Sequence, residues 1–93
     1  MRIGILRVEM RIPGCRSLKE KRSIIKRHIN RLQRQFNISI AEIDNHDNHG
    51  FCTLGIVTIH GKNDSSQKTL DRIISELEQS DYLQLYDYCI EII

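Results

Sequence analysis

The chain has 93 residues, of which 40% are hydrophobic and 28% are charged, with a single proline. This length and composition are typical of one folded domain, spanning residues 1–93, and exclude a disordered tail. No apolar run approaches the roughly 18 residues of a membrane span, and alternating sequence follows Met1 without a leader segment. We therefore expect a cytoplasmic protein.

The formal net charge of +2 conceals an uneven distribution along the chain. Residues 1–36 contain eleven Lys or Arg residues against two acidic ones, and residues 37–93 contain three against ten. The molecule is therefore strongly dipolar along its sequence, and the fold decides whether it is also dipolar in space.

Residues 2–12 alternate in polarity and predict a long strand. Pro13 and Gly14 should end it, because proline lacks an N–H group and glycine permits a tight turn. The face expected to meet the helices carries Gly4, Leu6, Val8, Met10 and Ile12. The opposite face carries Ile3, Ile5, Arg7, Glu9 and Arg11.

Residues 17–36 predict one long amphipathic helix. Ser17 is a suitable N-cap, and Glu20 can reach back to its N–H group to complete a capping box. The helix should end near Gln35, with Asn37 as a left-handed terminator. The apolar stripe contains Leu18, Ile25, Ile29, Leu32 and Phe36. The opposite side contains Lys19, Lys26, Arg27, Arg31 and Arg34.

The rest of the chain predicts a hairpin, a second helix and a last strand. Residues 38–44 are β-rich, and their apolar pattern changes phase between Ile40 and Ala41, which predicts a bulge or burial on both faces. Residues 45–50 form a polar loop before a strand at 51–60. After a loop at 61–63, a second helix should run to about Ser80, with Asp64 or Ser65 as its N-cap.

The apolar stripe of this second helix contains Leu70, Ile73, Ile74 and Leu77. Residues 83–93 then predict the last strand. The order β-α-β-β-α-β, with right-handed crossovers, predicts an α+β ferredoxin-like sandwich: a four-stranded antiparallel sheet with two helices on one face.

Several short segments resemble the bacterial YlxP-like family over nearly the whole chain. They are MRIG at 1–4, IPG at 12–14, SLKEKR at 17–22, FNIS at 36–39, AEID at 41–44 and TLGI at 53–56. This resemblance implies a small ferredoxin-like protein of undefined biochemical role, encoded in many bacteria among genes for translation initiation and ribosome maturation. The family supplies no catalytic residues.

The basic side of the first helix is the main candidate site. Its surface of one sign is about five turns long, near the scale needed to follow a phosphate backbone. The candidate nucleic-acid-binding residues are Arg16, Lys19, Lys26, Arg27, Arg31 and Arg34. The alternatives are an acidic protein partner and a plain solvated face. A phosphate could also sit at the helix start, near Arg16 and Lys19.

The uncovered face of the sheet favours self-association over base stacking. RNA-recognition modules stack bases on aromatic residues of the central strands. Here the first strand has none on that face, and the 51–60 strand has only Phe51 at its edge. Four aliphatic residues on this face suit a homodimer instead. They are Ile3, Ile5, Val57 and Ile59.

The remaining polar residues predict no catalytic centre. Asp44 to His49 resembles a metal or small-ligand site, but a solvated turn explains it better because the loop lacks rigid ligand spacing. The cysteines at 15, 52 and 89 form no Cys-x-x-Cys pair, which favours idle thiols; Cys15 alone has neighbours that would activate it. His28 is expected to be a hydrogen-bonded interfacial residue, and His60 has no catalytic neighbour in sequence.

The glycine loops, nucleophile elbow and zinc signature of common enzymes are absent from the sequence. We therefore predict a non-enzymatic RNA-binding protein without a cofactor, which contacts ribosomal RNA or ribosomal subunits through the first helix in ribosome maturation or translation. One alternative is a dimeric module that holds an acidic protein with the same helix. A further alternative is a small-ligand or metal sensor at the 44–49 hairpin.

Overall fold

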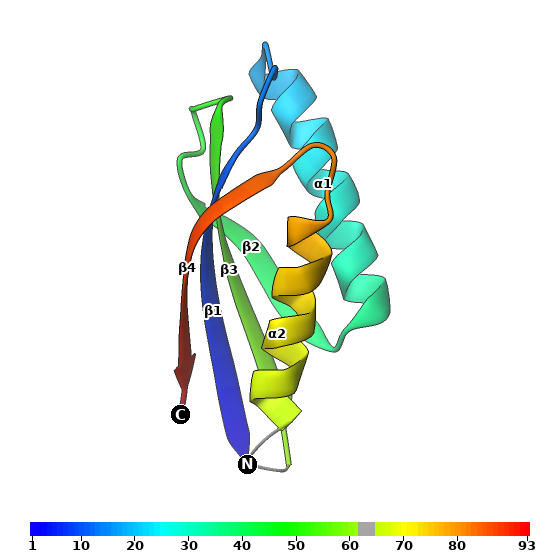
Figure 1. Cartoon of the computed structure of the whole chain (residues 1–93), viewed down its shortest axis with the longest axis vertical. Helices are drawn as coiled ribbons and strands as arrows, with labels where there is room; N and C mark the ends of the chain where they lie inside the picture. Colours follow the sequence, from blue (N-terminus) through cyan, green and yellow to red (C-terminus); the bar gives the residue numbers. More distant parts are fainter. Residues whose placement is uncertain (62–64) are drawn as a thin grey trace.

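The computed structural model describes residues 1–61 and 65–93, which form four strands and two helices (Figure 1). In chain order these are β1 (Arg2–Arg11), α1 (Leu18–Gln35), β2 (Ile38–Asp44), β3 (Phe51–His60), α2 (Ser65–Glu78) and β4 (Gln84–Ile92). The sheet order is β2-β3-β1-β4 with antiparallel pairing throughout. Both helices cover one face of this sheet, so the predicted ferredoxin-like sandwich is confirmed.

The core lies between the helices and the covered face of the sheet. The predicted inward face of β1 is buried, and so is the predicted stripe of α2. Gly4 favours close packing here because a Cβ at that position would lie 3.0 Å from Leu70 and 3.2 Å from Ser66, both on α2. Glycine therefore allows the first turns of α2 to pack closely on the sheet.

Two predictions near the start of α2 fall at residues that the structure does not describe. The loop at Lys62 and Asn63 and the N-cap candidate Asp64 lie outside the described residues. Ser65, the other cap candidate, is the first residue of the helix itself. In the described residues, no helix is long and apolar enough to cross a membrane.

The start of α1 follows the predicted capping box only in part. Ser17 is the N-cap, and its hydroxyl accepts the Glu20 N–H at 3.1 Å, as expected. The Glu20 carboxylate, however, accepts the N–H of Arg16 at 3.2 Å instead of the Ser17 N–H. The turn before the helix, with Gly14 at a φ of +75°, brings the Arg16 donor within reach of Glu20.

The end of α1 differs from the prediction. Phe36 caps the helix in an extended conformation, and its N–H donates to the Leu32 carbonyl at 2.9 Å. Asn37 is not left-handed; among the described non-glycine residues, only Asn45 has a positive φ. The helix stops because Phe36 buries its ring in the core and the chain continues directly into β2.

The bulge predicted for β2 exists but lies later in the strand. The register shifts between Glu42 and Asp44, two residues beyond the phase change at Ile40 and Ala41. Burial on both faces is wrong, because Ala41 is exposed and Ile43 is 46% exposed. On the side of β2 that faces the helices, Glu42 interrupts the apolar pattern. Its carboxylate has a buried partner.

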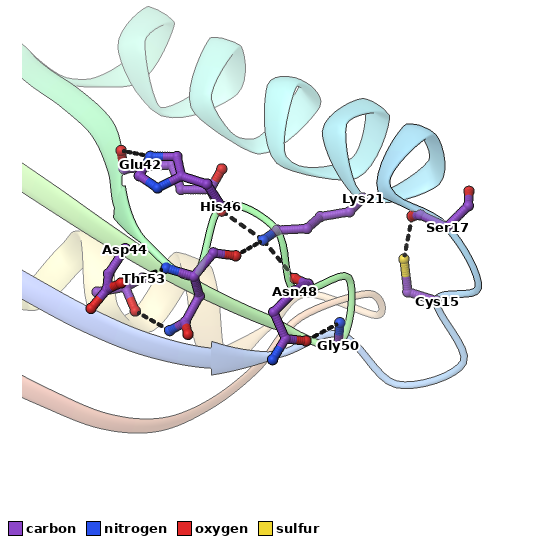
Figure 2. Close-up of polar contacts among 10 residues, drawn as sticks. Cys15, Ser17, Lys21, Glu42, Asp44, His46, Asn48, Gly50 and Thr53 are labelled. Atoms are coloured by element: carbon purple, nitrogen blue, oxygen red, sulfur yellow. Dashed lines mark hydrogen bonds and ion pairs between the residues drawn. The ribbon is translucent and has the colours of Figure 1, made fainter.

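That partner is Lys21, which joins α1 to the β2–β3 hairpin and is only 1% exposed. Its ammonium group donates to the carbonyl oxygens of Asn45 at 2.6 Å and Asn48 at 2.7 Å (Figure 2). The Glu42 carboxylate lies 2.8 Å from the same nitrogen. Lys21 therefore lays its stem over the core and pairs with an acid.

We predict that Lys21→Met lowers the free energy of unfolding by about 3 to 5 kcal/mol, because it leaves a largely buried carboxylate without its counter-charge. Urea denaturation followed by circular dichroism measures this loss. Lys19→Met is the matched control, since Lys19 is exposed two residues earlier in the same helix. Equal midpoints for the two variants would show that the Lys21 contacts contribute little.

Candidate nucleic-acid interface

The basic residues predicted for nucleic-acid binding are all exposed on or just before α1. Helix geometry divides them between different parts of this surface. Arg27, Arg31 and Arg34 line one groove, which they share with the end of α2 and the connection to β4. The structure therefore brings three of the six predicted residues into one site.

The groove has a volume of about 560 Å³, within the range of about 300–1,000 Å³ that is usual for small-molecule sites. On the side of α1 it is lined by the three arginines together with His28 and Asn30. The opposite side consists of residues 79–82, where the chain leaves α2 and turns beside α1 (Figure 1). We call this hollow the α1 groove.

A second hollow of about 380 Å³ continues along α1 toward its start. Lys19 and Ser17 line it, and Arg27 and Tyr82 border both hollows. Arg16 and Lys26 are not among the described residues that line these two hollows. These two predicted residues extend the basic surface but do not belong to the groove.

Tyr82 is the residue that sequence reasoning missed at this site. It is 50% exposed, and the Arg27 guanidinium lies 4.8 Å from its ring centroid. His28 meets the same ring edge-on, with centroids 6.5 Å apart. An exposed aromatic ring beside three arginines is a typical feature of sites that bind nucleic-acid bases.

The position of Tyr82 is set by a hydrogen-bond network around Ser80. The Ser80 hydroxyl oxygen accepts the N–H groups of Tyr82 and Leu83, each at 3.1 Å. Its own proton can then be donated to Nε2 of His28 at 2.7 Å, while Nδ1 of His28 donates to the Ile24 carbonyl at 2.7 Å. The expected interfacial role of His28 is confirmed, and this network ties the connection to α1.

The charges on the groove side of α1 are only weakly neutralised. Arg31 lies 3.8 Å from the Glu76 carboxylate, with 65% of the arginine side chain exposed. In the described parts of the chain, no carboxylate lies within ion-pair distance of Arg27 or Arg34. Asp81 also lines the groove, on its far side. The arginines therefore present a net positive potential to solvent.

The alternative phosphate site at the start of α1 is less suitable. Ser17 already accepts one of the free helix N–H groups, and the Glu20 carboxylate occupies the space beside Arg16. A second anion there would face that carboxylate at close range. This geometry favours the groove, farther along the helix, as the anion-binding region.

The hairpin at 44–49 is a turn held by its own chain. Asp44 accepts the Asn45 N–H at 2.8 Å, and two of the loop carbonyls bind Lys21 (Figure 2). His46 contacts the Glu42 carbonyl through Nε2 at 3.0 Å. Across residues 1–61 and 65–93, no cluster of three His, Cys, Asp or Glu residues suited to a metal ion is found.

Cys52 is buried near the charged groups of Lys21 and Glu42. Its burial and the neighbouring Glu42 carboxylate raise the pKa of the thiol to about 12, with Lys21 opposing this effect. A thiol with such a pKa is a poor nucleophile at neutral pH. Cys15 is also buried, and its thiol donates to the Ser17 carbonyl at 3.4 Å.

The residues predicted for a dimer face meet in pairs on the open side of the sheet. Ile3 lies opposite Ile59, and Ile5 lies opposite Val57, in the β1–β3 register. Ile59 is 49% and Val57 is 41% exposed, while their β1 partners are half-buried. The structure therefore brings all four predicted residues into one small apolar patch.

An aromatic cluster at the other end of the open face was not predicted. Phe51 and Tyr86 meet edge-on with ring centroids 6.3 Å apart, and the Arg11 guanidinium lies 5.6 and 5.9 Å from the two rings. Tyr86 reaches this face because β4 bulges opposite Glu9 and Met10. Periodicity along the sequence does not reveal that bulge.

The fold and this surface define a ferredoxin-like α+β protein that presents a basic helix beside an exposed tyrosine. Residues 3–90 match the family described as a protein of unknown function (DUF503), and the chain belongs to this family. It is 34% identical over 76 residues to the uncharacterized protein YlxP of Bacillus subtilis (strain 168), covering 82% of this chain and 83% of that protein. The resemblance seen in the sequence is thus confirmed.

Solved structures with low sequence identity share the fold. The de novo designed protein Foldit4 matches with a TM-score of 0.55 and 15% identity, covering 98% of this chain and 96% of that one. The C-terminal domain of the MgtC protein from Mycobacterium tuberculosis matches with a TM-score of 0.55 and 14% identity, covering 100% and 88%. A designed protein with a ferredoxin fold, LFR1 1, matches with 0.51 and 19%, covering 100% and 84%.

We predict that Ser80→Ala lowers the free energy of unfolding by about 1 to 3 kcal/mol, because it removes the acceptor of two N–H groups and the partner of His28. Thermal and urea unfolding measure the change. Ser75→Ala, at an exposed position of α2, is the matched control and should alter stability by less than about 0.5 kcal/mol. If the two variants are equally stable, the network does not hold the connection.

Proposed function

We propose that this protein binds structured RNA, in ribosome maturation or translation, through the basic side of α1, without catalysing a reaction. Its partner would be ribosomal RNA or a ribosomal subunit, and its place of action the cytoplasm. The observation that carries the proposal is the α1 groove, where Arg27, Arg31 and Arg34 line one wall. The ribosomal context comes from the resemblance to the YlxP-like family.

The arrangement of charge supports a polyanion as the partner. The groove arginines follow successive turns of α1, and Lys19 lies about two turns before Arg27. The only ion pair among these four in the described residues is the long contact to Glu76. Bringing like charges together costs stability unless an anion is bound. Guanidinium groups suit phosphate because they offer paired N–H donors.

We predict that the Arg27→Ala, Arg31→Ala, Arg34→Ala triple variant folds normally and binds ribosomal RNA at least about tenfold more weakly than the unchanged protein. All three residues are exposed, so the fold should survive. Binding of the purified, nuclease-treated protein to ribosomal RNA and to isolated subunits is measured over a series of salt concentrations. The logarithm of the binding constant should fall linearly with that of salt concentration, and more shallowly for the variant.

The matched control removes three other positive charges, at Arg2, Arg7 and Lys68, which lie outside α1. It changes the net charge equally but should bind RNA nearly as well as the unchanged protein. If RNA binding weakens equally in the two variants, net charge alone explains the effect. No binding by the unchanged protein at low salt would overturn the RNA proposal and favour an acidic protein as the partner of α1.

A second candidate function is self-association through the apolar patch of Ile3, Ile5, Val57 and Ile59. The direct cross-strand pairing of these residues and the exposure of two of them support it. Such a dimer would leave α1 on the outside of both copies, because α1 covers the opposite face of the sheet. It is therefore compatible with RNA binding.

We predict that the unchanged protein forms a concentration-dependent dimer and that Val57→Lys shifts it to monomer, because a charge would be buried in the contact. Sedimentation equilibrium measures the mass. Tyr88→Lys is the control, since Tyr88 is 51% exposed on the edge strand β4. A monomer at all concentrations would exclude this second function.

A further inference from the structure

We propose that the α1 groove holds one unpaired nucleotide of the bound RNA, with its base stacked on Tyr82 and its phosphate against Arg31 and Arg34. This inference rests on the proposed function and names the part of the RNA that the groove recognises. In this proposal Tyr82, which the sequence did not single out, gives the protein a preference for single-stranded over double-stranded RNA.

The shape of the site supports one base and not a continuous duplex. Tyr82 borders both hollows beside α1 as well as a third hollow of about 370 Å³ at the start of β4. Tyr82 therefore has depressions on more than one side and is half exposed. Bases in a duplex are stacked on one another, so only an unpaired base can lie on such a ring.

The existing contacts of Tyr82 show how a base would be held. Arg27 already lies over the ring at 4.8 Å, and His28 fixes its edge. A guanidinium plane and an aromatic ring are the two surfaces on which unstacked bases are commonly placed. The backbone that carries the ring is held in place, because the Tyr82 and Leu83 N–H groups are bound to Ser80.

The two walls of the groove differ in a way that orients the nucleotide. The α1 wall carries Arg31 and Arg34, which suit the phosphate. The far wall carries Gln79 and Asp81. Asp81 would repel a phosphate but can accept a hydrogen bond from a base amino group or a ribose hydroxyl. The phosphate therefore belongs on the helix side and the base and ribose on the other.

Side-chain amides are available to contact the base edge. Asn30 and Gln79 both line the groove and are exposed. In the part of the chain that the structure describes, neither side-chain amide takes part in a hydrogen bond. An amide offers a donor and an acceptor together, which matches the polar edges of a nucleobase.

The test compares two probes of the same length, oligouridylate of about ten nucleotides and an RNA duplex, at one salt concentration. The unchanged protein should prefer oligouridylate. Tyr82→Leu should weaken binding of oligouridylate by about 5- to 150-fold, the range found for loss of one stacked base, and leave the duplex nearly unaffected. Tyr88→Leu, at an equally exposed tyrosine, is the matched control.

A fluorescent variant gives a second readout that a merely structural role would not change. The chain has no tryptophan, so Tyr82→Trp introduces a single indole at the proposed stacking position. Its fluorescence should be quenched on addition of oligouridylate and not of duplex, whereas Tyr88→Trp should respond to neither. Because indole stacks at least as well as phenol, Tyr82→Trp should retain binding.

The outcomes separate this inference from the proposed function. If both probes bind equally, or if Tyr82→Leu binds oligouridylate like the unchanged protein, the nucleotide site is wrong. The RNA-binding function then stands on the arginines alone, provided that their removal still abolishes binding. If neither probe nor ribosomal RNA binds at low salt, both proposals are overturned.

Discussion

The buried ammonium group of Lys21 joins α1 to the β2–β3 hairpin. A lysine has three N–H donors, and here three oxygens lie within 2.8 Å of the nitrogen: two hairpin carbonyls and the Glu42 carboxylate. Removing such a charge from water costs several kcal/mol, and only a complete set of partners offsets that cost. The positions of the hairpin turn, α1 and Glu42 of β2 therefore depend on one another.

The direction of Lys21 also determines which side of α1 reaches the groove. Because an α-helix turns about 100° per residue, Leu32 lies about 20° from Lys21 around the axis, and both face the core. Measured from Lys21 around the helix axis, Arg31 lies about 80° and Arg27 about 120° toward the side of Tyr82. Lys26 lies about 140° in the opposite direction. This rotation explains why the groove contains some basic residues of the helix and excludes others.

The sequence predicts what depends on local order, and misses what depends on contacts between distant segments. Period-2 and period-3.6 patterns located every strand and helix, and with them the exposed basic side of α1. The partners of Lys21 stand 24 and 27 residues away along the chain, and the contact of His28 with Ser80 spans 52 residues. Such pairings follow from the assembled fold, and so does the place of Tyr82 beside Arg27. Neither leaves a periodic signal.

The structure contains two clusters of aromatic rings with arginine, and their surroundings differ. On the open face, the Arg11 guanidinium lies over both Phe51 and Tyr86, at 5.6 and 5.9 Å from their ring centroids. Partial desolvation and the Glu9 carboxylate raise the pKa of Tyr86, whose hydroxyl donates to Glu9 at 3.4 Å. The phosphate of a base stacked there would meet the Glu9 carboxylate. Tyr82 also has a guanidinium over its ring, but Arg31 and Arg34 line the groove beside it, so charge favours the helix side for a nucleic acid and leaves the sheet for contacts of lower polarity.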